Sequence, residues 1–332
     1  MTGLRKKLFF IINIMVVSIL IFISFTYLFG KILSKDISLE PILPKANPDF
    51  NAQNFLSRSG VYLISYADGP EVYFKNQNAL AASALNKGID FILNYRRSHL
   101  DPQFVKQYAS ILNQKIGAGY WLWKPWIILK TLETIPENEI LIYADSGLIF
   151  RNPITPLIEL ANQHDIILFE YDPKKYWGKP INITKREIFI ELDCDTEKCH
   201  TGSHVWAGLL VLRNTKKSRD FIKNWLNTCC NEKLLTDVFD PHVQQHAAFF
   251  VHYHDESILN TLYNKNPEDK YLFQSKLLFD EYATWHHRNF EAEDSSLLVA
   301  NQHNCSTMAH TLQNDLLNNY LILSLRKLLS GR

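Results

Sequence analysis

The sequence lacks any basic cluster beyond Arg5, Lys6 and Lys7, and it has no paired-cysteine motif and no internal repeat. Its 332 residues carry a formal net charge of only +1. A protein that binds nucleic acid usually presents a basic patch or stripe, which neutralises phosphates. We therefore expect no nucleic-acid partner and no other acidic polymer as a ligand.

The chain has few cysteines, and none of them forms a C-x-x-C pair. The five are Cys194, Cys199, Cys229, Cys230 and Cys305. Without paired spacing we expect no zinc site. The sequence leaves two possibilities for these cysteines, disulfide-bonded or free. In an oxidising compartment Cys194 and Cys199 would close a short disulfide loop, with Cys305 pairing to Cys229 or Cys230; otherwise they are free buried thiols.

Charged residues are missing altogether from Leu8 to Gly30. About 20 such residues are enough to cross a bilayer as a helix. We therefore predict a single transmembrane anchor at residues 8–30, after a short N-terminal tail at residues 1–7. A cleaved signal peptide would need a shorter apolar core and a small-residue cleavage site, which residues 29–33 do not offer. Three basic residues precede the span and two follow it, which favours a cytoplasmic N terminus.

The segment after the anchor differs in composition from the rest of the chain. Residues 31–58 contain Pro41, Pro44 and Pro48 and no sustained hydrophobic period, as is typical of a semi-extended stem. The remaining residues, 59–332, belong to a chain with 46% hydrophobic and 21% charged residues, which is a globular composition. We predict that they form one catalytic domain.

Strand and helix patterns alternate at the start of this domain. Gly60–Tyr66 and Asp90–Tyr95 read as buried strands, and Gln77–Lys87 between them reads as a helix that stops at a glycine. This order predicts right-handed βαβ units and a parallel sheet. Further helices are expected at Tyr120–Leu132 and over the long region His242–Tyr263.

An apolar run inside residues 139–150 is interrupted by Asp145 and a glycine. A short run of this kind predicts a central parallel strand. Asp145 would then lie at the carboxyl edge of the sheet, where open α/β sheets bind their ligands. Just upstream, residues 117–126 place three tryptophans and a lysine at an expected helix start.

The order of these two blocks, G-x-G-Y-W-x-W-K-P and then I-x-Y-x-D-x-G, resembles the amino-terminal half of a group of GT-A glycosyltransferases. The resemblance covers about residues 60–288. It implies a GT-A-like, Rossmann-like α/β fold with a mostly parallel sheet flanked by helices. In those families the strand-end acid belongs to a D-x-D motif that meets a divalent cation and the sugar nucleotide. This chain reads Asp145-Ser146-Gly147, so the second acid is absent.

The resemblance implies a donor site at this edge, with Mn²⁺ or Mg²⁺ held by Asp145 and completed by phosphates and waters. His286 is a second candidate metal ligand. The candidate donor-binding residues are Tyr66, Asp68, Arg96, Arg97, Trp123, Lys124, Asp145 and Gly147. Purely structural roles stay open for several of them: a cap for Asp145, turn formation for Asp68, surface charge for the arginines and core packing for the tryptophan.

Asp255 is the candidate catalytic base, alongside Asp145 as the second catalytic residue. It lies in His254-Asp-Glu-Ser257, which resembles an acid-bearing helix near the acceptor in related enzymes. Consecutive helix positions point about 100° apart, so Glu256 would face a different target. The alternative is a salt-bridged helix surface.

These expectations describe a membrane-anchored enzyme that moves a hexose from a nucleotide diphosphate sugar to a hydroxyl of a glycan or glycolipid. Two other functions remain open: a catalytically inactive sugar-binding or assembly protein, and a membrane-tethered sugar-phosphate transferase. A cytoplasmic N terminus suits a Golgi type II enzyme in a eukaryote. A bacterial protein would instead sit in the inner membrane in the opposite orientation, or be exported.

Overall fold

The computed structural model describes residues 59–171, 178–274, 278 and 282–285. The chain divides into residues 1–50 and 51–332, and every described residue belongs to the second unit. The predicted anchor at 8–30, the whole of the predicted stem at 31–58, His286 and Cys305 lie outside the described residues. Within the described part, no helix has the length and apolar character needed to span a membrane.

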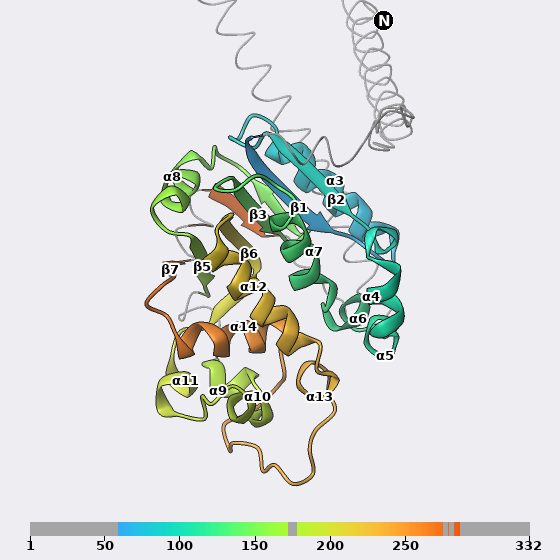
Figure 1. The fold of residues 1–332 in the computed structure, drawn as a ribbon, viewed down its shortest axis with the longest axis vertical. Coiled ribbons are helices and arrows are strands. Elements are labelled where there is room, and N and C mark those ends of the chain that lie inside the picture. Colours follow the sequence, from blue (N-terminus) through green and yellow to red (C-terminus); the bar gives the residue numbers. More distant parts are fainter. Residues whose placement is uncertain (1–58, 172–177, 275–277, 279–281, 286–332) are drawn as a thin grey trace, which may run out of the picture. The chain divides into compact units, whose positions relative to one another are not determined.

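A six-stranded sheet forms the centre of the fold (Figure 1). The strands are β2 (Phe91–Tyr95), β1 (Val61–Tyr66), β3 (Ile140–Ala144), β6 (Val205–Arg213), β5 (Ile166–Glu170) and β7 (Tyr271–Gln274), in that spatial order. Strand β6 pairs antiparallel with both β3 and β5, whereas the other pairings are parallel. Five strands therefore share one direction, which confirms the predicted mostly parallel α/β sheet.

The sheet is buried on both faces because alternate side chains of its central strands enter two different cores. In β3, Leu141 and Tyr143 join one hydrophobic cluster, and Ile140 and Ile142 join the other. The first cluster includes residues of α7 (Trp123–Leu132), α12 (Lys216–Cys229) and α14 (His254–Lys265). The second includes residues of α3 (Glu71–Ala84) and α8 (Thr155–Gln163). The continuous apolar runs in the sequence reflect this two-sided burial.

Shorter elements connect these layers. Strand β4 (Leu148–Phe150) pairs antiparallel with β8 (Ala283–Trp285) in a separate two-stranded sheet. The short helices are η1 (Arg97–His99), α4 (Pro102–Gln107), α5 (Ala109–Leu112), α6 (Gly117–Tyr120), α9 (Pro180–Ile183), α10 (Arg186–Glu191), α11 (Glu197–Thr201) and α13 (Glu232–Leu235).

Two predicted helices are corrected by the structure. The helix expected at Tyr120–Leu132 begins at Trp123, because Tyr120 and Trp121 have positive φ angles. The long helical region expected at His242–Tyr263 is helical only from His254 onward. Residues 242–253 form a loop held by individual hydrogen bonds, such as the Tyr253 amide to the Ile183 carbonyl at 3.0 Å.

Candidate functional site

A left-handed backbone turn leads into the helix that carries Lys124. Gly117, Ala118, Gly119, Tyr120 and Trp121 all have positive φ angles, between 51° and 100°. For residues other than glycine this conformation costs about 1–2 kcal/mol each, because Cβ crowds the following carbonyl. Backbone strain of this kind is concentrated at functional sites.

The two glycines of the turn are required by close packing as well as by φ. A Cβ atom on Gly117 would lie 2.3 Å from the Trp121 ring. A Cβ atom on Gly119 would lie 2.6 Å from Cα of Leu112, a backbone atom that cannot rotate away. The G-x-G spacing in the sequence is therefore explained by the shape of this turn.

Trp123 and Tyr66, both predicted to contact the donor, pack against each other. Their ring centroids are 3.9 Å apart and the ring planes are nearly parallel, and the two residues are 2% and 3% exposed. The Trp123 indole N–H donates to the Gly117 carbonyl at 2.9 Å. Burial and the nearby Asp68 raise the pKa of the Tyr66 hydroxyl. Both rings are therefore packed inside the protein near this edge of the sheet, and neither is exposed for stacking on a ligand.

Lys124 lies at the centre of a buried cluster of charges. Its Nζ is 2.9 Å from Oδ2 of Asp255 and 3.7 Å from Oδ1 of Asp145. It also donates to the Ala207 carbonyl at 3.3 Å. The side chains of the lysine and both acids are each at most 7% exposed. The structure therefore brings together three residues that were selected separately from the sequence.

Asp145 follows the last residue of β3, as predicted. Its Oδ1 accepts a hydrogen bond from the Tyr143 hydroxyl, and its backbone amide donates to the Gly208 carbonyl at 2.8 Å. Its own carbonyl accepts from the Leu148 amide at 3.0 Å, which closes the turn containing Gly147. The backbone of Asp145 thus closes the turn that follows, and its carboxylate faces the lysine.

Asp255 lies in the first turn of α14 and is 3% exposed. The alternative of a solvent-facing helix surface is wrong for this residue. Burial raises the pKa of its carboxyl to about 7, against the opposing effect of Lys124, and Glu256 and Asp145 add to the rise. A carboxyl that titrates near neutrality is suited to accept a proton.

Glu256 faces a different target, as the helical geometry predicted. Its Oε1 is 3.1 Å from Nε2 of His204, and its Oε2 accepts from the Ala207 amide at 2.9 Å. These contacts fix the start of β6 against α14. Because β6 runs antiparallel to its neighbours, its amino end lies at the edge where the other strands have their carboxyl ends.

More accessible polar groups lie at the ends of β1 and β2, which are adjacent in register at Tyr66 and Tyr95. Asp68 accepts from the Tyr66 hydroxyl at 3.1 Å and is half-buried. Arg96 covers the Phe74 ring at 4.9 Å, and Arg97 donates to Oδ1 of Asn113 at 2.7 Å. Both arginines are partly exposed and therefore accessible to a ligand.

Some members of this cluster were missed in the sequence. Tyr143, which donates to Asp145, and His204, which contacts Glu256, were not selected. The tyrosine lies in β3 two residues before the acid, which directly follows the strand, so period-two alternation places both on one face. This spacing could have been used to predict Tyr143 as a neighbour of Asp145. The Ala207 and Gly208 carbonyls could not have been predicted, because every residue has a backbone carbonyl.

Comparisons with known proteins add a similarity of fold. No family profile and no curated protein matches the chain, but 74 chains of solved structures do. One is a glycosyltransferase involved in glycosylation of the major capsid of PBCV-1, with 11% identity, coverage of 74% of this chain and 98% of that one, and a TM-score of 0.42. Another is mouse xyloside xylosyltransferase 1, with 11% identity, coverage of 65% and 84%, and a TM-score of 0.37.

A third match is glucosyl-3-phosphoglycerate synthase from Mycobacterium tuberculosis, solved with Mn²⁺ and UDP, at 12% identity. It covers 77% of this chain and 82% of that one, with a TM-score of 0.35. A putative glucose-1-phosphate thymidylyltransferase from Bacillus anthracis also matches. The chain is similar to solved structures of glycosyltransferases, but at this level of similarity no residue role is transferred.

Proposed function

We propose that this protein is a glycosyltransferase that moves a hexose from a nucleotide diphosphate sugar to a hydroxyl of a glycan or glycolipid. The observation that carries the proposal is the buried contact of Lys124 with Asp145 and Asp255 at the carboxyl edge of the sheet. Ligands of open α/β sheets bind at this edge. Burying one ammonium with two carboxylates is costly, and such groups are concentrated where chemistry requires them.

The charge balance of the cluster bears on how a diphosphate would bind. One ammonium faces two carboxylates, so the cluster is net negative when both acids are ionised. The charge of Lys124 is therefore already balanced by the two carboxylates. This differs from the expectation that Lys124 binds the donor directly. Its proposed role is to hold Asp145 and Asp255 in place. Arg96 and Arg97, at the accessible rim, are the better candidates for direct phosphate contacts.

The number of carboxylates at this edge also decides how a metal ion could bind. Asp145 offers one carboxylate and Gly147 offers none, which is too few ligands for Mn²⁺ or Mg²⁺. Oxygens of the donor diphosphate would complete the shell, so Asp145 fits a cation only when the nucleotide is present. Bound there, the ion would neutralise the leaving diphosphate.

Asp255 is the proposed base. Its ionised carboxylate would accept the proton of the acceptor hydroxyl as that oxygen forms a bond to the sugar carbon. The bond from that carbon to the diphosphate breaks, and the nucleoside diphosphate leaves with the electron pair. Lys124 contacts both acids, the Ala207 carbonyl accepts from Lys124, and the Gly208 carbonyl accepts from the backbone amide of Asp145. Removing such a base typically lowers the rate by about 10²–10⁴-fold.

The proposal includes anchoring by residues 8–30, with the domain on the far side of the membrane from the N terminus. The disulfide between Cys194 and Cys199 supports an oxidising compartment. In a eukaryote this arrangement corresponds to a Golgi type II enzyme, because sugar nucleotides are available in that lumen. In a bacterium the orientation would be reversed, or the protein exported.

The test is a transfer assay on the full-length protein with a panel of nucleotide diphosphate sugars, with and without a divalent cation. Release of nucleoside diphosphate should be found with one donor and lost in Asp145→Asn, while Asp220→Asn, an exposed acid on α12, leaves it unchanged. Donor binding without turnover would instead indicate the inactive sugar-binding or assembly protein. A phosphodiester in the product would indicate a sugar-phosphate transferase.

A further inference from the structure

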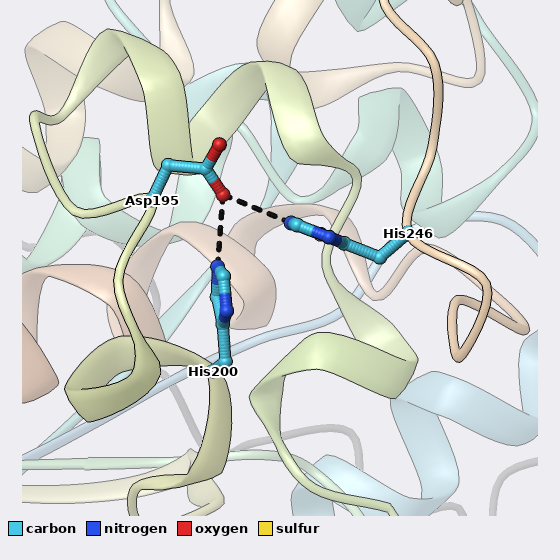
Figure 2. A group of neighbouring side chains, drawn as sticks. All are labelled: Asp195, His200 and His246. Atoms are coloured by element: carbon cyan, nitrogen blue, oxygen red, sulfur yellow. Dashed lines mark hydrogen bonds and ion pairs between the residues drawn. The ribbon is translucent and has the colours of Figure 1, made fainter.

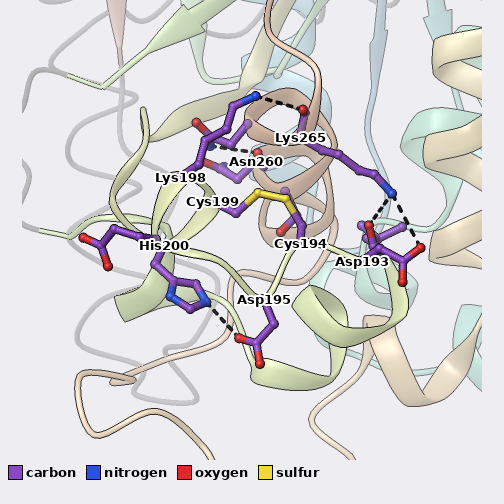
Figure 3. The surroundings of a disulfide bond; sticks show 12 residues. Asp193, Cys194, Asp195, Lys198, Cys199, His200, Asn260 and Lys265 are labelled. Atoms are coloured by element: carbon purple, nitrogen blue, oxygen red, sulfur yellow. Dashed lines mark hydrogen bonds and ion pairs between the residues drawn. A yellow bond between two sulfur atoms is a disulfide. The ribbon is translucent and has the colours of Figure 1, made fainter.

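A disulfide-closed loop lies away from the charge cluster, in the segment between β5 and β6. Cys194 and Cys199 are bonded, with their Cα atoms 5.8 Å apart (Figure 3). Each cysteine is followed directly by a polar residue, Asp195 and His200 respectively. Because the bridge restricts the backbone at both positions, it holds these two side chains close together.

A third residue reaches the same point from a distant part of the chain. His246, in the loop before α14, has its Nε2 2.9 Å from Oδ1 of Asp195, and Nε2 of His200 is 2.8 Å from the same oxygen (Figure 2). The three candidate ligand atoms all lie within 4.8 Å of one another. The two imidazole rings meet edge to face, with centroids 4.4 Å apart.

The loop that carries His246 is held in place by α10. The side-chain oxygen of Gln245 accepts from the Arg186 amide at 2.8 Å, and its amide nitrogen donates to Glu187 at 2.7 Å. Arg186 also donates to Oδ2 of Asp195 at 2.9 Å, which directs Oδ1 towards the histidines. Partners of this kind orient the ligands of metal sites.

We propose that Asp195, His200 and His246 bind a zinc ion. Two imidazole nitrogens and one carboxylate oxygen are typical zinc ligands, and three of them leave a fourth position for water. In a tetrahedral site with bonds of about 2.0–2.1 Å, ligand atoms are about 3.3 Å apart, so the two contacts of Asp195 with the histidines, at 2.8 and 2.9 Å, would lengthen slightly to admit the ion. The expectation of no zinc site considered only cysteine spacing, and this group contains no cysteine.

The surroundings suit an ion that enters from solvent and is then held. The three side chains are between 12% and 22% exposed, so they are mostly enclosed but still reachable. The Phe189 ring packs against both histidines, at 4.8 and 6.1 Å between centroids. The ion would join the disulfide loop to the segment that enters α14, the helix of Asp255. The site shares no residue with the Lys124 cluster.

The experiment measures zinc binding by the full-length protein under non-reducing conditions, after removal of metal by a chelator. We expect one tightly bound zinc ion per chain. His200→Ala and His246→Ala should each weaken binding at least tenfold, whereas His242→Ala, an exposed histidine in the same loop, should leave it unchanged. Wild-type affinity in either of the first two variants would overturn the proposal.

Cobalt substitution provides a second measurement that does not depend on the variants folding. Co²⁺ bound by the unaltered protein should give the intense visible bands of a four-coordinate ion, and Zn²⁺ should displace them in a one-to-one ratio. Absence of these bands, or no stoichiometric zinc in the wild-type protein, would show that Asp195 only accepts hydrogen bonds from the two histidines.

Discussion

Lys124 at the start of α7 and Asp255 at the start of α14 form a buried ion pair at 2.9 Å. Lys124 also lies 3.7 Å from Asp145 at the end of β3. The pair therefore links two helices and the central strand through one ammonium group. Breaking a buried pair by removing one partner leaves an uncompensated charge, so each member affects both stability and the site.

Lys124→Met removes the ammonium and leaves two carboxylates close together. We expect a loss of about 3–5 kcal/mol in the free energy of unfolding, because breaking a buried pair is strongly destabilising. Denaturant titration measures this change. Lys130→Met, on the same helix but with the side chain 49% exposed, is the matched control and should change stability by less than about 1 kcal/mol. Equal effects of the two substitutions would contradict a structural role for the buried pair.

Asp255 should produce a pH dependence near neutrality. Because burial raises the pKa of its carboxyl to about 7, the base is ionised only above that pH, and the transfer rate should rise through pH 7. Stability should change in the opposite sense. The folded pKa lies above the unfolded value of about 3.9, so the stabilising contribution is complete below pH 4 and lost as the pH rises through 7.

Asp255→Asn tests both parts of this expectation, since it removes the titrating group and keeps its shape. The pH–rate profile should lose its rise through pH 7, and the residual rate should be about 10²–10⁴-fold lower. Chemical unfolding at pH 5 and pH 8 should show a smaller difference in the variant than in the wild type. An unchanged pH–rate profile would remove Asp255 from the reaction.

Mn²⁺ and nucleoside diphosphate should bind with strong positive coupling. Asp145 alone is a poor site, and each ligand must strengthen the other by the same factor. Calorimetric titration of Mn²⁺ with and without UDP measures the coupling, and Asp145→Asn should abolish it. His246→Ala should not, which separates this effect from binding at the proposed zinc site. Equal Mn²⁺ affinity in both titrations would exclude a metal bridge at Asp145.

Gly119→Ala should destabilise the protein more than Gly69→Ala. Both glycines have positive φ, 100° and 81°, so alanine carries a similar backbone cost of about 1–2 kcal/mol at each. Only Gly119 faces a close backbone atom, whereas a Cβ on Gly69 meets nothing within 4 Å. Crowding should add on the order of 1–3 kcal/mol. Denaturant midpoints compare the two, and similar values would mean that Leu112 moves aside.

Removal of residues 1–30 should release the protein from membranes. A long run that is both uncharged and strongly apolar lies there, and the proline-containing segment 31–58 separates it from β1. Fractionation of cells expressing the shortened chain should place it in the supernatant. Recovery with membranes after a high-salt wash would show that another segment contributes to attachment.

Much of the central sheet could be predicted because its signals are local. The apolar run before Asp145 indicated a buried strand end, and that strand is β3. The first strand appears as β1. The helix expected at Gln77–Lys87 appears as α3, but it begins earlier, at Glu71, and ends at Ala84, before the glycine. Apolar runs that are bounded by turn-forming residues such as glycine and proline are compatible with few kinds of secondary structure.

The features that were not predicted correctly depend on contacts between distant segments of the chain. Residues 242–253 have no strong local preference against a helix, but Phe250 and Val251 donate to the Asn182 carbonyl, and the segment is not helical. The pairing of Lys124 with Asp255 likewise depends on how α7 and α14 pack. No spacing rule connects such positions in a single sequence.

Ala118, Tyr120 and Trp121 hold a backbone conformation that is the mirror image of the one L-residues prefer. Together they cost about 3–6 kcal/mol, which the surrounding contacts must offset. Residues of the opposite chirality would adopt this turn without that cost. A semisynthetic protein with D-alanine at position 118 should therefore unfold at higher denaturant concentration than the natural chain. The chirality of these residues, together with their side-chain contacts, therefore affects the stability of the segment that precedes Lys124.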